Sequence, residues 1–183
     1  AARYLEYLYP QGRAFRTSSV NFALVLPWNS QEQAEEALST IHSRFQQPWV
    51  LGDISFLLPC CIVDLRCGSS VDKAEEIVEQ LEYALGLAKK EGPELIRFDE
   101  SVHRKMHQKQ ELIEIMHRSV KERRFRVWYQ PIYCCHDDVF CSAEALLRLS
   151  DYQGNPVSPD VFIPLAEETG MISQLTWIVL EEV

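Results

Sequence analysis

The sequence lacks both the long apolar run of a membrane span and a surplus of basic residues. No stretch approaches the roughly 18 to 20 consecutive apolar residues that cross a bilayer. Lys and Arg number 18 against 27 Asp and Glu, which gives a formal charge of −9. Nucleic acids and anionic lipids are held by clustered cations. We therefore expect no nucleic-acid polymer as partner, no membrane contact in this segment and a cytoplasmic location, with membrane anchoring through N-terminal regions outside the segment left open.

The CxxC pairs of a zinc site are also missing. Three of the cysteines lie in apolar, strand-like runs, where a free thiol packs like a small hydrophobic side chain. This pattern favours reduced, partly buried thiols in a cytosolic protein. The six cysteines form two tight clusters: Cys60, Cys61 and Cys67, and Cys134, Cys135 and Cys141.

The apolar spacing alternates between strand and helix periods, which favours an α/β fold. Because helical patterns run to both ends, at 1–9 and 171–183, we expect the chain to be a piece of a longer protein. The runs 50–58 and 60–67 are predicted to pair as strands of one sheet. Further strands are predicted at 13–17, 22–26 and 94–98, and helices at 31–45, with Ala34, Leu38, Ile41 and Phe45 buried, and 71–91, with Ala74, Ile77, Val78, Leu81, Leu85 and Ala88 buried.

A charged segment with a sparse apolar stripe follows, and it predicts a linker helix over 101–121. The stripe could serve a homodimer contact or transmit a signal between domains. His103 and His107 stand four residues apart on this helix, as metal ligands can. Without a third ligand nearby, the interpretation favoured here is that they are exposed helix residues. The stripe consists of Val102, Met106, Leu112, Met116 and Val120.

From Phe125 onward the pattern predicts strands at 126–133 and 140–149. Ser158 and Pro159 then open a helical segment that Gly170 closes. Because side chains alternate along a strand, Glu144, Leu146 and Arg148 share one face. A carboxylate can anchor a divalent metal and a guanidinium can neutralise phosphate oxygens, so the pair suits a phosphodiester site. The alternative is an ordinary ion pair between the two side chains at a strand end.

The segment 16–27 resembles the hairpin of GGDEF diguanylate cyclases. The run 84–92, ALGLAKKEG, is similar to the family's last helix, and Phe98-Asp99 follows at the expected place. In that family two glycines approach a triphosphate and acidic residues hold Mg²⁺. Here the motif positions carry Cβ atoms and no carboxylate, and the family's inhibitory RxxD is absent from 9–12, so we predict no cyclase activity. The five motif positions are Ser18, Ser19, Val20, Asn21 and Phe22.

The runs YQPIY at 129–133, AEALLRL at 143–149 and SPDVFIPLAEETG at 158–170 closely resemble the N-terminal part of EAL domains. The resemblance implies a TIM-like barrel that hydrolyses cyclic di-GMP. It implies that Glu144 binds Mg²⁺ or Mn²⁺ and that Arg148 contacts a phosphate. Gln130, Leu146 and Pro164 would border the dinucleotide.

These resemblances predict an α/β chain that combines a mixed-sheet, nucleotidyl-cyclase-like domain with the first βα elements of a TIM-like barrel. The predicted boundaries are a degenerate GGDEF-like domain at 1–100, a linker helix at 101–124 and the start of an EAL domain at 125–183. A barrel needs roughly 200 residues, so this segment alone is expected to be inactive and without a cofactor. The full-length protein is expected to be a cyclic di-GMP phosphodiesterase with a regulatory GGDEF-like domain. The alternative is a non-catalytic receptor or protein-interaction module.

Overall fold

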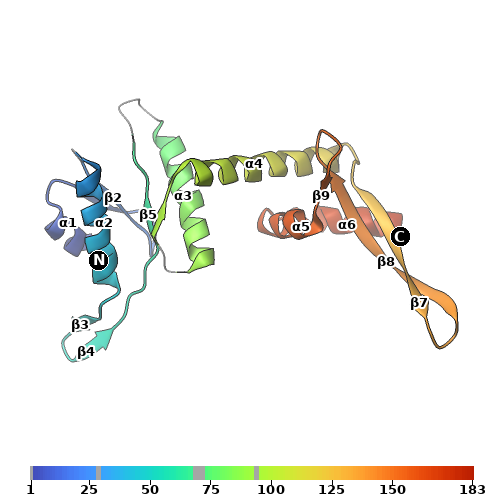
Figure 1. The fold of residues 1–183 in the computed structure, drawn as a ribbon, viewed down its shortest axis with the longest axis horizontal. Coiled ribbons are helices and arrows are strands. Elements are labelled where there is room, and N and C mark those ends of the chain that lie inside the picture. The colour runs from blue at the N-terminus through green and yellow to red at the C-terminus, as the bar shows by residue number, and fades with distance from the viewer. Residues whose placement is uncertain (1, 28–29, 68–72, 93–94) are drawn as a thin grey trace. The chain divides into compact units, whose positions relative to one another are not determined.

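The computed structural model describes residues 2–27, 30–67, 73–92 and 95–183 (Figure 1). The chain divides into two compact units, Ala1–Phe98 and Asp99–Val183. Both units mix α-helices with β-strands, as the alternating periodicity predicted.

The described residues of the first unit form three helices, α1 (Ala2–Leu8), α2 (Gln31–Phe45) and α3 (Ala74–Glu91). The cap that the sequence indicates starts α2, because the Ser30 Oγ accepts a hydrogen bond from the Gln33 amide at 3.3 Å. This satisfies one of the N–H groups that a helix start leaves without an intrahelical partner. Both α2 and α3 form where the 3.6-residue period of apolar residues predicted helices.

The strands of the first unit form separate two-stranded ladders. β1 (Arg13–Arg16) and β2 (Phe22–Val25) make the predicted antiparallel hairpin. β5 (Ile62–Asp64) pairs in parallel with β6 (Leu95–Arg97), with α3 as the crossover between them. This is a βαβ unit, the usual way to join parallel neighbours.

The predicted pairing of 50–58 with 60–67 is wrong. The first of these runs folds back on itself as β3 (Trp49–Leu51) and β4 (Ile54–Phe56), an antiparallel hairpin. The turn contains Gly52 at φ +61°, a left-handed conformation that glycine adopts without steric cost. The Gly52-Asp53 pair was therefore a turn signal inside a run that hydropathy alone reads as one strand.

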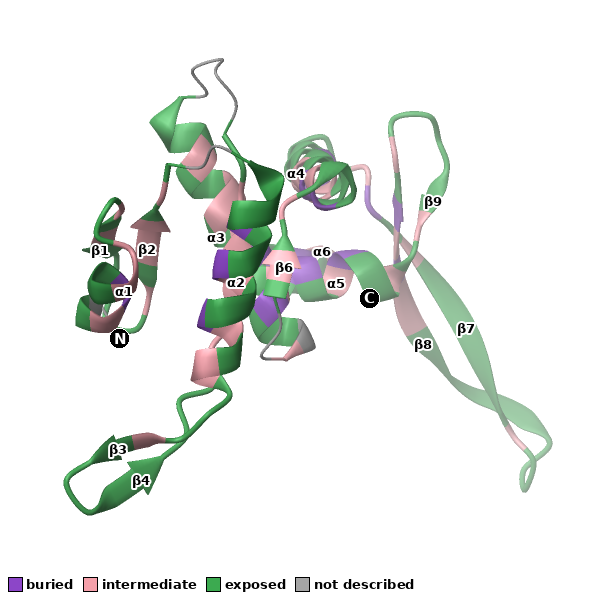
Figure 2. Ribbon diagram, turned by 60° about the vertical axis from the view of Figure 1, so that its left-hand side comes forward, coloured by how far each residue is buried: buried purple, intermediate pink, exposed green. Residues whose placement is uncertain are grey.

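Burial in the first unit is thin, as Figure 2 shows for its helices. Two residues of the predicted α3 stripe, Ala74 and Val78, are exposed. The strands that contact α3 have only three residues each, and its buried residues, Ala84 and Ala88, lie in its second half. The buried hydrophobic residues here are mostly small: Leu5, Ala34, Ala37, Ile41, Ala84 and Ala88.

An aromatic cluster joins α1, α2 and β3 around Trp49. Its ring lies 5.4 Å from the Tyr4 ring and 5.5 Å from the Phe45 ring, centroid to centroid. The Arg44 guanidinium carbon lies 3.8 Å from the Trp49 ring centroid, within cation–π range. These rings supply contact area that the alanine-rich helix faces do not.

The second unit begins with a long helix, followed by a sheet and two shorter helices. The β7–β8 hairpin extends beyond α5 and α6 in Figure 1, and the strand order is β7-β8-β9. Within residues 99–183 this three-stranded sheet does not close into a barrel. The elements are α4 (Glu100–Lys121), β7 (Arg126–Cys134), β8 (Val139–Ser150), β9 (Pro156–Val157), α5 (Pro159–Glu168) and α6 (Ile172–Glu182).

The core of this unit is continuous and built from large side chains. Phe162 and Met116 are fully buried within it. The helix predicted as a linker therefore packs against its own unit along its second half, where Leu112 and Val120 also contact the core. The buried cluster comprises Ile115, Met116, Phe125, Leu147, Leu149, Phe162, Leu165, Ala166, Met171 and Leu175.

Across the residues described above, no helix has the length and apolar character that crossing a membrane would require.

Candidate functional site

The residues predicted to share a strand face do lie together on the sheet of the second unit. In the antiparallel register of β7 and β8, Gln130 lies opposite Glu144 and Trp128 lies opposite Leu146. Directly opposed residues project to the same face, with Cβ atoms about 4.5–5.5 Å apart. Arg148 follows two positions after Leu146 and so shares that face. One side of the hairpin thus carries a carboxylate, an amide and a guanidinium.

The core of the unit fixes which way this face points. Leu147 and Leu149 alternate with the site residues along β8, and both are buried in the core. Val127, opposite Leu147 on β7, packs against the same core. Because a strand sends successive side chains to opposite faces, Glu144 and Arg148 are turned away from the core. The hydrophobic side of the hairpin therefore positions its polar side.

Glu144 is exposed, and within the described residues it has no hydrogen bond or ion pair to another side chain. The alternative of a Glu144–Arg148 ion pair is wrong, because four strand positions separate their Cα atoms by roughly 13 Å. An unpaired carboxylate keeps its oxygen lone pairs open to a ligand.

Arg148 is held by two contacts on its own sheet. Its Nη1 donates to the Leu147 carbonyl at 3.1 Å. Its guanidinium carbon lies 5.5 Å from the Trp128 ring centroid, which is within cation–π range. A guanidinium has five N–H donors, so these contacts leave most of them able to bind an anion.

Trp128 was missed by the sequence reasoning. It is 63% exposed, although it is one of the largest apolar side chains of the unit. The signal was present, because Trp128 precedes Gln130 by two positions and period two places both on one face.

Among the residues predicted for the EAL-like site, Pro164 alone lies outside this sheet. It is in α5, between residues that bury their side chains in the core, and is itself exposed. The strand register brings together Gln130, Glu144, Leu146 and Arg148 without it.

The strand face fits part of a binding site for a hard divalent cation. Mg²⁺ and Mn²⁺ prefer oxygen ligands, and proteins commonly bind Mg²⁺ through one or two carboxylates together with substrate phosphates. Glu144 offers one such carboxylate, with the Gln130 amide opposite. In the part of the chain that the structure describes, no three His, Cys, Asp or Glu side chains gather as a complete metal site.

The β1–β2 hairpin of the first unit carries the other predicted site, at Ser18–Phe22. Its turn is closed by its own side chains, because the Ser18 Oγ accepts from the Asn21 amide at 3.1 Å and from the Val20 amide at 3.4 Å. The Arg16 guanidinium donates to the carbonyls of Ser18 and Ser19 at 3.0 and 2.8 Å. Backbone amides that could bind a phosphate oxygen are thus occupied within the turn.

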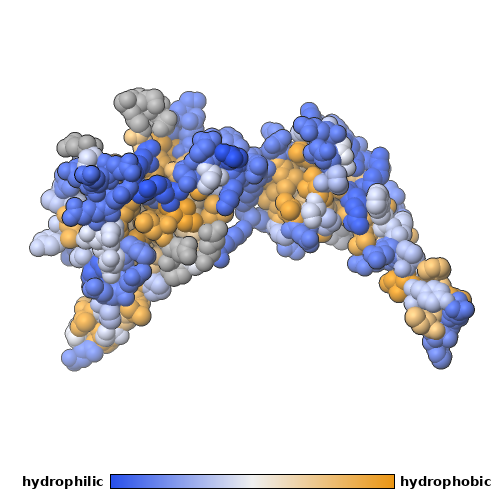
Figure 3. Space-filling model, viewed as in Figure 1, coloured by the Kyte–Doolittle hydropathy of each residue, from blue (hydrophilic) through white to orange (hydrophobic). Residues whose placement is uncertain are grey.

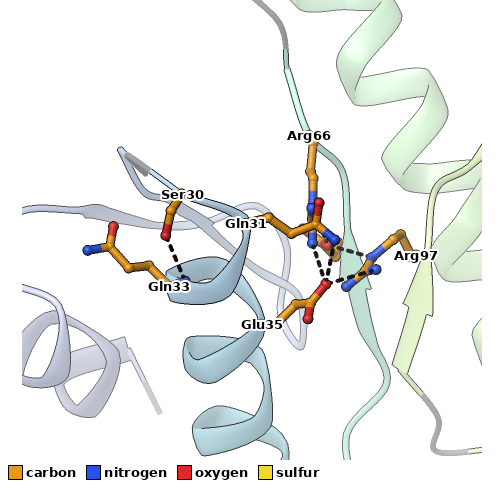
Figure 4. Close-up of polar contacts among 7 residues, drawn as sticks. Ser30, Gln31, Gln33, Glu35, Arg66 and Arg97 are labelled. Carbon is orange, nitrogen blue, oxygen red and sulfur yellow. Dashed lines mark hydrogen bonds and ion pairs between the residues drawn. The ribbon is translucent and has the colours of Figure 1, made fainter.

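A charged cluster in the first unit is paired internally (Figure 4). The Nε atoms of Arg66 and Arg97 donate to the Asp64 Oδ2 at 3.3 and 3.2 Å. Both arginines also reach the Glu35 Oε1, at 3.6 and 3.5 Å. The hydrogen bond that Gln31 donates, and then the two arginines, hold the pKa of Glu35 below its ordinary value. Two cations face two carboxylates, so the cluster joins α2 to β5 and β6 and has no surplus charge for a ligand.

Residues 113–183 match the family model of the EAL domain. Cyclic di-GMP phosphodiesterase PdeL of Escherichia coli is 36% identical over 58 residues, which cover 32% of this chain and 16% of that protein. The bifunctional diguanylate cyclase/cyclic di-GMP phosphodiesterase MucR of Pseudomonas aeruginosa is 23% identical over 168 residues, 91% of this chain and 24% of that protein. The chain thus spans less than a quarter of the length of these relatives.

The solved structure of Vibrio cholerae LapD, containing its S helix, GGDEF and EAL parts and bound to c-di-GMP, is 14% identical to the chain. The structural match covers 93% of this chain and 40% of the LapD chain, with a TM-score of 0.43. The family-model match and the relatives agree with the motifs found on β7, β8 and α5. Residues 113–183 thus match an EAL domain, and the chain is similar to GGDEF/EAL cyclic di-GMP signalling proteins.

Proposed function

We propose that the chain is part of a metal-dependent cyclic di-GMP phosphodiesterase in which Glu144 is a metal ligand. The observation that carries this proposal is the unpaired Glu144 carboxylate, set directly opposite Gln130 on a strand face that also bears Arg148. A phosphodiesterase needs an oxygen ligand for its cation and a positive group for phosphate charge. The Glu144 carboxylate and the Arg148 guanidinium lie on one face, and they do not pair with each other.

The site residues have separate roles in this proposal. Arg148, steadied by Trp128, binds a non-bridging phosphate oxygen. Gln130, Leu146 and Pro164 border the dinucleotide. The cation, Mg²⁺ or Mn²⁺, supplies Lewis-acid activation of water when it is bound. The remaining metal ligands must come from other segments of the full-length protein, because Glu144 is the one carboxylate on this face among the described residues of β7 and β8.

The first unit is proposed to be a GGDEF-like regulatory domain without cyclase activity. Two observations support this. The positions Ser18 to Asn21 carry no carboxylate for a metal, and the Ser18 hydroxyl occupies two amides of the turn. The unit has the βαβ arrangement of β5, α3 and β6, and its proposed role is to contact a neighbouring domain.

A homodimer through the first unit or through α4 is a further part of the proposal. Met116 is fully buried in the core of its own unit. A lysine at that position would therefore damage the fold and would not report on a dimer contact. Sedimentation of the full-length protein should be measured with changes confined to exposed positions of α4, such as Gln108→Glu. A mass that stays monomeric in the unchanged protein contradicts this part.

The decisive experiment compares the full-length protein with its Glu144→Ala variant. We expect the unchanged protein to convert cyclic di-GMP to the linear dinucleotide in the presence of Mg²⁺ or Mn²⁺. We expect Glu144→Ala to lower kcat/KM by about a hundredfold or more, because losing a metal ligand costs more than disturbing its supporting shell. Product formation is measured by chromatography, and dinucleotide binding by calorimetry.

Glu181→Ala is the matched control, since it removes an exposed carboxylate from α6. Its activity should equal that of the unchanged protein. If the unchanged protein binds the dinucleotide without hydrolysing it, the protein is a receptor and the enzymatic proposal fails. Equal hydrolysis by Glu144→Ala and the unchanged protein overturns the role of Glu144.

A further inference from the structure

The first turns of α4 bring two histidine rings together. The Nε2 atoms of His103 and His107 lie 3.0 Å apart, and the ring centroids are separated by 4.3 Å. His107 is exposed and His103 is half-buried. Residues four apart on a helix stack on one face, so the helix backbone itself sets this spacing. The sequence pattern favoured two exposed helix residues, whereas the structure brings their rings into contact.

We propose that His103 and His107 form a bidentate binding site for a nitrogen-seeking divalent cation, Ni²⁺ or Cu²⁺. Metal–nitrogen bonds are about 2.0–2.1 Å long. For two ring nitrogens 3.0 Å apart, such bonds meet at the metal at an angle of about 94°. That angle suits the square-planar or tetragonal geometry of Ni²⁺ and Cu²⁺ better than the tetrahedral geometry of Zn²⁺.

The direct hydrogen bond between the rings requires one neutral nitrogen to accept from the other. A metal replaces that shared proton, and both nitrogens then donate their lone pairs to it. Water fills the other coordination positions, because the described residues place no third His, Cys, Asp or Glu ligand beside the pair. Further side-chain oxygens lie along the same helix, since Gln110, Glu111 and Glu114 line a hollow beside His107.

The histidine pair lies close to the boundary between the two units. α4 starts at Glu100, two residues after the first compact unit ends at Phe98. The Asp99 carboxylate already caps this start, accepting from the Ser101 and Val102 amides at 2.8 and 3.0 Å. A metal that bridges His103 and His107 would hold the next turn in helical form. It would therefore be a ligand of the segment that connects the two units.

The test is a titration of the untagged full-length protein with NiCl₂, followed by calorimetry. We expect one site that depends on both rings, so His103→Ala and His107→Ala should each weaken binding by at least about tenfold. The double variant should lose no more than either single variant, because a chelate needs both nitrogens. His117→Ala removes an exposed histidine of the same helix and should bind Ni²⁺ as the unchanged protein does.

A second readout separates this site from background binding to the six thiols. Ni²⁺ should raise the melting midpoint of the unchanged protein and of His117→Ala, because a ligand that binds only the folded state stabilises it. It should not raise that of His107→Ala beyond the shift common to all variants. Equal Ni²⁺ binding by His103→Ala, His107→Ala and the unchanged protein would overturn the proposal, as would an equal loss in His117→Ala.

Discussion

The two units of this chain differ in how their predicted sites relate to their cores. In the first unit the hairpin Ser18–Phe22 lies among short, separate ladders, and its turn is closed by its own polar side chains. In the second unit the strand face of Glu144 and Arg148 backs directly onto a core of large side chains. Both units leave apolar residues uncovered at the ends of hairpins, on β3–β4 in the first and on β7–β8 in the second (Figure 3).

This difference shows how a core can position chemistry. Leu147 and Leu149 anchor β8 by one face, and the other face must then present Glu144 and Arg148 outward. In the first unit most buried residues are alanines, which bury little area. A polar group there is positioned by local hydrogen bonds. The second unit should consequently respond to core damage more strongly than the first.

The largest effect is expected from Phe162→Ala in the second unit. Phe162 is fully buried, with its ring 6.0 Å from that of Phe125. Truncating a buried Phe costs about 3–5 kcal/mol in transfer energy and cavity formation. Hydrogen exchange of the full chain should then show lost protection across 99–183. Ile41→Ala, in the first unit, should cost about 2 kcal/mol.

Trp177→Ala is the control for this comparison, because Trp177 is 66% exposed and its loss leaves no cavity. Protection across 99–183 should remain as in the unchanged chain. A greater loss of stability from Ile41→Ala than from Phe162→Ala would reverse the order of the two units.

An intermediate effect is expected from two glycines of the first unit, with opposite signs. Gly52→Ala should destabilise by about 1–2 kcal/mol, because an L-residue is strained in the left-handed conformation that Gly52 adopts at φ +61°. Gly86→Ala should stabilise by about 0.5–1 kcal/mol, since glycine is unfavourable within a helix. A Cβ added at Gly86 would meet nothing within 4 Å. Thermal melts of both variants measure these changes in stability. If the two variants shift the melting midpoint in the same direction, the prediction is contradicted.

The smallest effect is expected from the pH dependence of Glu35. Its pKa is held below the ordinary value of 4.5 by the hydrogen bond from Gln31, followed by Arg97 and Arg66. A lowered pKa means that the folded state favours the carboxylate. Its contribution is complete above the ordinary pKa and is lost as the pH falls through the folded value.

Melting midpoints measured from about pH 5 down to about pH 3 should therefore fall less steeply in Glu35→Gln than in the unchanged chain. Because Glu35 is exposed to solvent, the difference is expected to be slight. Raised salt should reduce it further, since exposed ion pairs are screened. A steeper fall in the variant would show that the cluster is not held by the charge of Glu35.

The spacing of apolar residues in the sequence was sufficient to predict the long helices and two of the hairpins. α2, α3 and α4 formed where the apolar spacing placed them, and the β1–β2 and β7–β8 hairpins formed between their turn residues. The error at 50–58 arose because the Gly52-Asp53 turn lies inside a run that is otherwise mostly apolar. Val78 was predicted to be buried and is exposed, because a helix period identifies an apolar face but not whether a strand is long enough to cover it.

The sequence by itself determined that Glu144, Leu146 and Arg148 share a face, since that follows from strand geometry alone. It also determined that Ser18 to Asn21 lack the carboxylates of a metal site. Only the tertiary structure decided that Gln130 and Trp128 join that face, because the partner residues depend on the register between two strands. It likewise decided that His103 and His107 meet at 3.0 Å, since helix periodicity gives a shared face but side-chain rotamers set the distance between the rings.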